Sequence, residues 1–229
     1  MHINKLLLYS GHRLFVGGNY KKTSITIHST GNPLSSAQSE RKWLDNPTNK
    51  RNASWHYCVD QYCAIQAIED NNEAWHCGMD YGNMFSIGIE ICENGNRLKT
   101  LQNAVDLVTD KLIEYNLSIT DIKTHYDWTG KNCPRILLND NYIKDGLDWD
   151  WFIAQCKEKL EMKTTDMTQE QFNIYMDNYL KSRNVLPAST WAESTQKTAI
   201  DLGITDGTNP QMFATREQVV AMIVRAMKN

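Results

Sequence analysis

Residues 86–92 read Ser86-Ile87-Gly88-Ile89-Glu90-Ile91-Cys92, in which isoleucine alternates with small or polar residues. Side chains of a β-strand point alternately to opposite faces, so the three isoleucines share one face and the other four residues share the opposite face. The isoleucine face is expected to cover a hydrophobic core. On the other face Glu90 lies among small residues, which leaves the open space that a substrate groove requires.

Similar runs surround this segment and predict the rest of the sheet. Short apolar or alternating runs predict strands at 24–28, 55–60, 62–68 and 121–125. Apolar residues at helical spacing predict a long amphipathic helix from about Thr100 to Asn116, and further helices at 36–44 and 148–160. Strands interleaved with helices predict an α/β fold, a central sheet flanked by helices. The sheet is expected to be mixed, because Asp60-Gln61 can turn a hairpin.

The chain of 229 residues is longer than a typical single domain and is expected to contain two. A catalytic domain is predicted at 1–161, a polar linker at 162–166, and a small all-α domain of three helices at 167–229. Charged residues of the last segment balance, with six basic and six acidic side chains, so the net charge of -3 belongs to residues 1–166. No clustered basic face is present, which argues against a nucleic-acid partner.

Other sequence features concern the cellular compartment. No apolar stretch is long enough to span a bilayer, so no membrane partner is expected. The start has a short apolar stretch and no small-residue cleavage site, so it does not resemble a secretory signal peptide. The six cysteines show no repeated spacing and are expected to be reduced. The protein is therefore predicted to be made and held in a cytoplasm.

Three potential metal ligands stand out from the remaining polar residues. His28 ends the alternating run 24–28, and His125 and Cys133 lie in one short segment beside Lys131. Two histidines and one cysteine form a zinc set that leaves the fourth position open for water, as catalytic zinc requires. Positive neighbours of Cys133 favour the thiolate that a metal needs. The predicted cofactor is Zn²⁺, and the predicted class is a zinc hydrolase.

Five motifs occur in an order typical of a known family: His28 at a strand end, Ser54-Trp55-His56-Tyr57, Ala74-Trp75-His76-Cys77-Gly78, Ile87-Gly88-Ile89-Glu90-Ile91, and the segment from His125 to Pro134. Together they resemble the N-acetylmuramoyl-L-alanine amidases of phage lysins and peptidoglycan recognition proteins, over roughly residues 1–160. The resemblance implies cleavage of the amide between N-acetylmuramic acid and L-alanine in peptidoglycan. It also supports the zinc set and two catalytic residues.

The catalytic residues are assigned by chemical role. Glu90 is expected to act as the general base, and Lys131 to donate to the oxyanion that forms on the substrate. Some family members have a tyrosine where this chain has Trp55, and an indole cannot replace that hydroxyl. Trp55, Trp75 and His76 are predicted to contact substrate, although Trp75 also suits a core position and His76 also suits a hydrogen-bond partner of the metal ligands.

The C-terminal segment has a resemblance of its own. The turn 203–210, followed by Phe213-Ala214-Thr215-Arg216-Glu217, is similar to S-layer-homology modules that bind cell-wall polymers. A helical module for stability or dimerisation is the alternative, and an oligomer through this domain is possible. The chain as a whole is predicted to be an endolysin. A bacterial autolysin with the same chemistry and a non-catalytic peptidoglycan receptor are the alternatives, and Cys133 argues against the receptor.

Overall fold

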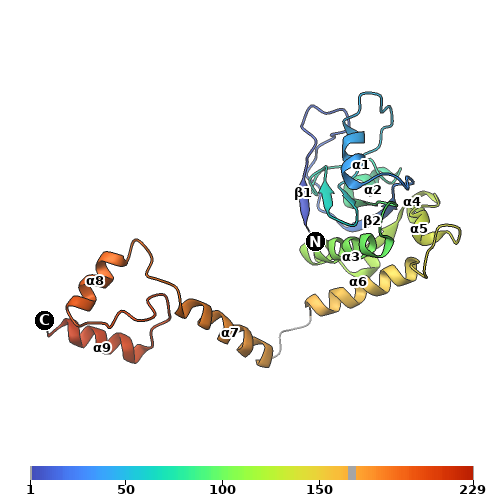
Figure 1. The fold of residues 1–229 in the computed structure, drawn as a ribbon. Coiled ribbons are helices and arrows are strands. Elements are labelled where there is room, and N and C mark those ends of the chain that lie inside the picture. The colour runs from blue at the N-terminus through green and yellow to red at the C-terminus, as the bar shows by residue number, and fades with distance from the viewer. Residues whose placement is uncertain (1, 165–168, 229) are drawn as a thin grey trace. The chain divides into compact units, whose positions relative to one another are not determined.

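The computed structural model describes residues 2–164 and 169–228, which belong to two compact units, 1–164 and 165–229 (Figure 1). Helix α6 (Trp149–Thr164) continues through the first part of the predicted linker, so the assignment of 162–164 to a linker is wrong. In this part of the helix Lys163 forms an ion pair with Asp110 of the neighbouring helix, at 2.5 Å between Nζ and Oδ1. Residues 165 and 166 of the predicted linker lie outside the described residues.

The first unit is built on one mixed sheet of six strands in the order β1-β4-β3-β5-β2-β6. The strands are β1 (Ile3–Lys5), β2 (Ser24–Ser29), β3 (Tyr57–Val59), β4 (Ala64–Gln66), β5 (Ser86–Ile91) and β6 (Ile122–Thr124). Strands β3 and β4 are antiparallel, whereas every other neighbouring pair is parallel. The predicted mixed sheet is confirmed. Strand β1 was missed, because three residues are too few to display an alternation.

One face of the sheet carries the larger core. The isoleucines of β2 and β5 pack there against helix α3 (Arg97–Glu114), which in turn packs on α6, as Figure 1 shows. Asn96 caps α3 by accepting a hydrogen bond from the backbone N–H of Lys99. This confirms the predicted isoleucine face and directs the polar residues of β2 and β5 to the opposite side.

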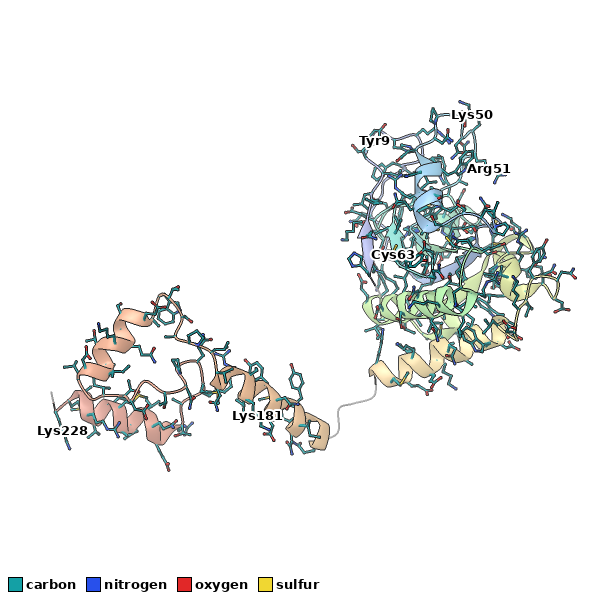
Figure 2. The ribbon with its side chains drawn as sticks, viewed as in Figure 1. Tyr9, Lys50, Arg51, Cys63, Lys181 and Lys228 are labelled. Atoms are coloured by element: carbon teal, nitrogen blue, oxygen red, sulfur yellow. The ribbon has the colours of Figure 1, made fainter. Side chains whose placement is uncertain are left out.

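The opposite face of the sheet is divided into an apolar part and a polar part. A smaller cluster, which includes Leu14, Leu44 and Ile65, packs there beneath helix α1 (Ala37–Leu44). Short helical segments complete the unit: α2 (Asp80–Phe85), η1 (Ile119–Asp121), α4 (His125–Thr129) and α5 (Arg135–Leu138). Side chains of the loop before β3, including Lys50 and Arg51, lie at the edge of the unit (Figure 2). The polar part of this face contains the candidate site.

The second unit contains three helices, α7 (Gln169–Asn184), α8 (Glu193–Asp201) and α9 (Arg216–Ala226). Thr215 caps α9 reciprocally with Gln218. None of the side chains from 172 to 228 is buried, and Lys181 on α7 and Lys228 after α9 are labelled in Figure 2. No helix within the described ranges is long and apolar enough to cross a membrane.

Candidate metal centre

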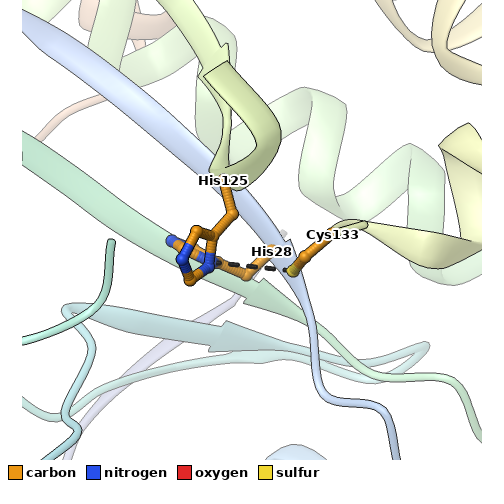
Figure 3. A group of neighbouring side chains, drawn as sticks. All are labelled: His28, His125 and Cys133. Carbon is orange, nitrogen blue, oxygen red and sulfur yellow. Dashed lines mark hydrogen bonds between the residues drawn. The ribbon is translucent and has the colours of Figure 1, made fainter. Parts of the chain in front are cut away.

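Three separate elements bring His28, His125 and Cys133 together (Figure 3). His28 lies near the end of β2, and His125 begins α4 directly after β6. Because Ile27 of β2 pairs with Thr124 of β6, the next residue along each parallel strand is a histidine, and the two rings meet. Cys133 lies in the loop before α5, where its carbonyl accepts a hydrogen bond from the N–H of Tyr126.

Local sequence explains why this loop returns to the sheet. Thr124 and Asp127 form a capping box at the start of α4, and Gly130 ends that helix with a φ of 73°. Further along, Arg135 makes a bidentate ion pair with the buried Glu93, with Nη2 2.6 Å from Oε2. These contacts anchor the loop on both sides of Cys133.

Two of the distances between donor atoms are close to those around a tetrahedral zinc ion. His28 Nδ1 lies 3.1 Å from His125 Nδ1 and 3.8 Å from Cys133 Sγ. Tetrahedral zinc with ordinary bond lengths places two nitrogen ligands about 3.3 Å apart and a nitrogen and a sulfur about 3.6 Å apart. All three donor atoms lie within 4.8 Å of one another. Two imidazoles and a thiol therefore converge as zinc requires, and the predicted metal set is confirmed.

The protonation states suit a cation at this point. Burial and neighbouring positive groups hold the pKa of His28 well below its usual value, and burial with Lys131 lowers the pKa of His125 to about 4. Both rings are therefore neutral at pH 7 and can offer lone pairs. Burial and Glu90 raise the pKa of the Cys133 thiol to about 12. A cation beside the sulfur would favour its thiolate form, and the N–H of Ser29 already donates to Sγ at 3.5 Å.

His76 lies behind His28 and not in an open groove. Its Nδ1 is 3.0 Å from His28 Nε2, and its side chain is buried. His56 lies next to it, with ring centroids 5.8 Å apart. The prediction that His76 contacts substrate does not agree with this placement. Its proximity to His28 favours the alternative, a hydrogen-bond partner of a metal ligand.

Glu90 lies directly beside the metal ligands. It pairs in register with His28 on β2 and with Cys58 on β3, so all three side chains share the polar face of the sheet. Its Oε2 is buried and has no hydrogen-bond partner among the described residues. Burial, followed by the charge of Glu40, raises the pKa of Glu90 to about 8, while Lys131 opposes this shift. An unpartnered carboxylate oxygen with this pKa suits proton transfer near neutral pH.

Lys131 is exposed, two residues before Cys133. Its positive charge lowers the pKa of His28, His125, Glu90 and Cys133, so the ammonium is near enough to influence all four groups. It is therefore placed where it can meet negative charge that forms on a substrate.

The two predicted aromatic contacts differ in placement. Trp55 is 6% exposed and belongs to the smaller core, which leaves its indole almost no surface for a substrate. Trp75 is half-buried against the same core and donates from Nε1 to Glu73 at 3.1 Å. Core packing explains the placement of Trp55, and Trp75 keeps only part of its surface open. No periodicity in the sequence distinguishes a buried indole from a groove indole.

Two supporting groups were not anticipated from the sequence. Trp128 of α4 donates from Nε1 to Thr26 Oγ1 at 2.9 Å, and Thr26 contacts Ser86 on the same polar face. Glu93, which anchors Arg135, also accepts from the N–H of Gly31. Each pair is separated by many residues in the sequence, so only the tertiary fold brings the partners together. The position of Glu93 just after a predicted strand is the one feature of the sequence that could have indicated its contact with Arg135.

Comparison with known proteins places this site in a family. Residues 19–136 match the Amidase_2 family, described as N-acetylmuramoyl-L-alanine amidase. The chain is 35% identical over 156 residues to the N-acetylmuramoyl-L-alanine amidase CwlA of a Bacillus species, covering 65% of this chain and 59% of that protein. It is 38% identical over 136 residues to the amidase XlyA of Bacillus subtilis strain 168, covering 57% of this chain and 42% of that protein.

A solved structure agrees in both sequence and fold. The catalytic domain of XlyA superposes with a TM-score of 0.61 at 33% identity, covering 68% of this chain and 99% of that domain. The chain spans about half the length of the curated relatives it matches. The matched region contains all three metal ligands, since His28, His125 and Cys133 fall within 19–136. This chain belongs to the N-acetylmuramoyl-L-alanine amidase family, Amidase_2.

Proposed function

We propose that this chain is a zinc-dependent peptidoglycan hydrolase that cleaves the amide between the lactyl group of N-acetylmuramic acid and L-alanine. The observation that carries the proposal is the convergence of His28, His125 and Cys133 beside Glu90 within a region that matches the amidase family. Peptidoglycan is the substrate that membership of this family implies.

His28 and His125 would hold the metal through Nδ1, and Cys133 through Sγ. When bound, Zn²⁺ would polarise the substrate carbonyl and lower the pKa of a bound water towards about 7. Glu90 would accept the proton of the attacking water at its unpartnered Oε2 and deliver that proton to the leaving amine. Lys131 would donate from Nζ to the oxyanion that develops on the substrate, a contribution of about 3 kcal/mol by comparison with other oxyanion donors.

The bond that is cleaved can be tested by mass analysis of products released from purified walls. The amidase reaction yields peptides with a free N-terminal alanine and leaves the glycan strands intact. New reducing sugar ends would indicate a glycosidase and would contradict the proposal. A non-catalytic receptor would release neither product, and the retention of Cys133 in the ligand set argues against that alternative.

For the second unit we propose binding to a cell-wall polymer. A groove of about 760 Å³ runs among α8, α9 and the turns between them, within this unit. Its lining includes Trp191 and Phe213, which are 84% and 67% exposed, beside the polar side chains of Asp206 and Asn209. A sugar ring has an apolar face and hydroxyl edges, so aromatic and hydrogen-bonding groups together suit a glycan.

Binding can be measured on purified walls with the full chain carrying Glu90→Gln, so that the polymer is not degraded. Trp191→Ala should lower the bound fraction severalfold, whereas Trp43→Ala serves as the matched control, because Trp43 is an exposed indole of the first unit. Equal binding by both variants would favour the alternative of a structural helical module.

Self-association is the second candidate for this unit. Apolar side chains of α9, including Val220, Ile223 and Val224, are 45% to 58% exposed, and such faces often mark contacts between chains. Sedimentation of the full chain over a range of concentrations tests this, and a monomer at all concentrations would exclude it. The choice between endolysin and autolysin, and retention in the cytoplasm until release by a pore, remain predictions.

A further inference from the structure

The ring of His28 needs a hydrogen-bond acceptor that its own strand does not supply. A neutral imidazole carries one hydrogen, on either Nδ1 or Nε2, and only the nitrogen without it can bind a metal. His28 directs Nδ1 towards His125 and Cys133, so its hydrogen must lie on Nε2. Some acceptor has to stabilise that tautomer.

His76 supplies this acceptor. Its Nδ1 lies 3.0 Å from His28 Nε2, and the two rings meet edge to face with an interplanar angle of 87°. The opposite assignment, with His76 donating to His28, would place a hydrogen on His28 Nδ1 where the metal ligands converge.

The other nitrogen of His76 carries the hydrogen of that ring in this assignment. An acceptor at Nδ1 places the hydrogen of His76 on Nε2, which is buried and has no hydrogen-bond partner of ordinary geometry among the described residues.

The position of the His76 ring is fixed from two sides. The side chain of Asn83 accepts from the backbone N–H groups of His76 and Cys77, at 3.0 Å and 3.1 Å. On the other side the ring lies over Gly88, where an added Cβ would come within 2.6 Å of the His76 Cγ. Glycine at this point of β5 therefore leaves the room that the ring occupies.

A third histidine supports the same strand. His56 accepts the N–H of Gly88 at Nδ1, 2.9 Å away, and its Nε2 lies 3.1 Å from the carbonyl of Asn72, to which it donates. Burial, followed by the charge of Lys22, lowers the pKa of His56 to about 3, so this ring is neutral as well. His56 thus holds Gly88, and Gly88 makes room for His76.

We propose that His76 is a positioning residue that accepts the Nε2 hydrogen of His28 and so directs the Nδ1 lone pair of His28 to the metal. This inference rests on the proposed zinc site, but it concerns zinc affinity and the tautomer of His28, which are measured without substrate. Partners of this kind commonly change metal affinity by about 10- to 100-fold.

Zinc affinity, measured by competition with a chromophoric chelator, is the first test. His76→Leu should raise the Kd for zinc by about 10- to 100-fold, whereas His76→Asn, which keeps an acceptor near the position of Nδ1, should restore most of the affinity. His2→Leu removes an exposed imidazole elsewhere and is the control. Unchanged affinity in a folded His76→Leu variant, or no restoration by asparagine in a folded chain, would overturn the proposal.

Gly88→Ala tests the same geometry without removing a histidine. Its Cβ would displace the His76 ring, so zinc affinity should fall while every ligand remains; Gly11→Ala, where the added Cβ would meet only the side chain of Tyr9, is the matched control. Equal zinc affinity in the two folded variants would contradict the proposed role of the ring position.

Nuclear magnetic resonance of the wild-type chain measures the tautomer of His28 directly and needs no variant that could fail to fold. With ¹⁵N-labelled histidine and zinc removed, the His28 signals should show a hydrogen on Nε2 and none on Nδ1. A hydrogen on Nδ1 would overturn the proposal. If the wild type shows the expected tautomer and zinc affinity but releases no alanine-terminated peptides, the proposed function fails and the positioning role stands.

Discussion

The two units of the chain differ in where their polar and apolar groups lie. In the first unit histidines 28, 56, 76 and 125 are buried beside a packed sheet, whereas none of the side chains from 172 to 228 in the second unit is buried. Burial fixes rings, lowers their pKa values and presents lone pairs to a metal. Exposure leaves aromatic side chains available to a partner. If the proposed functions hold, one chain separates chemistry that needs a dry, rigid site from recognition that needs an open surface.

The largest expected effect concerns proton transfer in the first unit. Glu90→Gln keeps the shape of the side chain but removes the base, so turnover should fall by about 10²-fold or more while zinc stays near one per chain. The wild-type rate should increase as the pH rises towards about 8, the pKa of Glu90, because the carboxyl group then loses its proton. Rate profiles and metal analysis check both points. Loss of zinc from the variant would show that Glu90 is a ligand.

The second effect is acid sensitivity confined to the first unit. All six histidines of the chain lie in residues 1–164, and the pKa values of the four buried ones are lowered. Below pH 6.5 the unfolded chain therefore binds more protons than the folded one, so the folded state loses stability as the pH falls.

Each such histidine contributes a loss of up to about 1.4 kcal/mol per pH unit in this range. Urea unfolding of the zinc-free chain at pH 7 and at pH 5.5 should show the transition of the first unit moving to lower urea, with the second unit much less affected. Equal shifts of both unfolding transitions would contradict the prediction that acid sensitivity is confined to the first unit.

The third effect tests packing directly. Ile89→Ala deletes a side chain that is fully buried in the larger core and should lower the free energy of unfolding by about 2–5 kcal/mol. Val220→Ala on α9, where the side chain is 58% exposed, should change stability by about 0.5 kcal/mol or less. Denaturation curves compare the two. A large cost at Val220 would mean that α9 is covered in solution, as self-association requires.

The smallest expected effect is that of salt on wall binding by the second unit. The basic and acidic residues of 167–229 balance, so affinity should depend on aromatic stacking and hydrogen bonds and should persist at 1 M salt, where the Debye length is about 3 Å. Pull-down of the Glu90→Gln chain on purified walls at low and high salt measures this. Binding that disappears at high salt would indicate electrostatic adsorption to anionic polymers.

Local patterns predicted much of the fold and the metal ligands. Alternation in 86–92 places the isoleucines on the core face, and the side-chain chemistry of His28, His125 and Cys133 predicts zinc without reference to their geometry. These predictions succeeded because strand periodicity and ligand type are properties of the residues themselves.

Other features depend on tertiary contacts that no local pattern contains. Trp55 was assigned to substrate, yet it packs in the smaller core, since burial of an indole depends on which helix covers it. The partner of His76 depends on β2 and β5 being neighbours and on Gly88 lying beneath the ring. The helix that continues to Thr164 is held partly by Lys163 and Asp110, which are distant in sequence.

Reconstitution with zinc tests the central claim most directly. The zinc-free chain should release no alanine-terminated peptides from purified walls, and activity should return in proportion to added zinc up to one equivalent per chain. Cys133→Ser should bind zinc far more weakly and stay inactive under the same conditions, while its second unit still binds walls. Full activity in the metal-free wild-type chain would contradict the account.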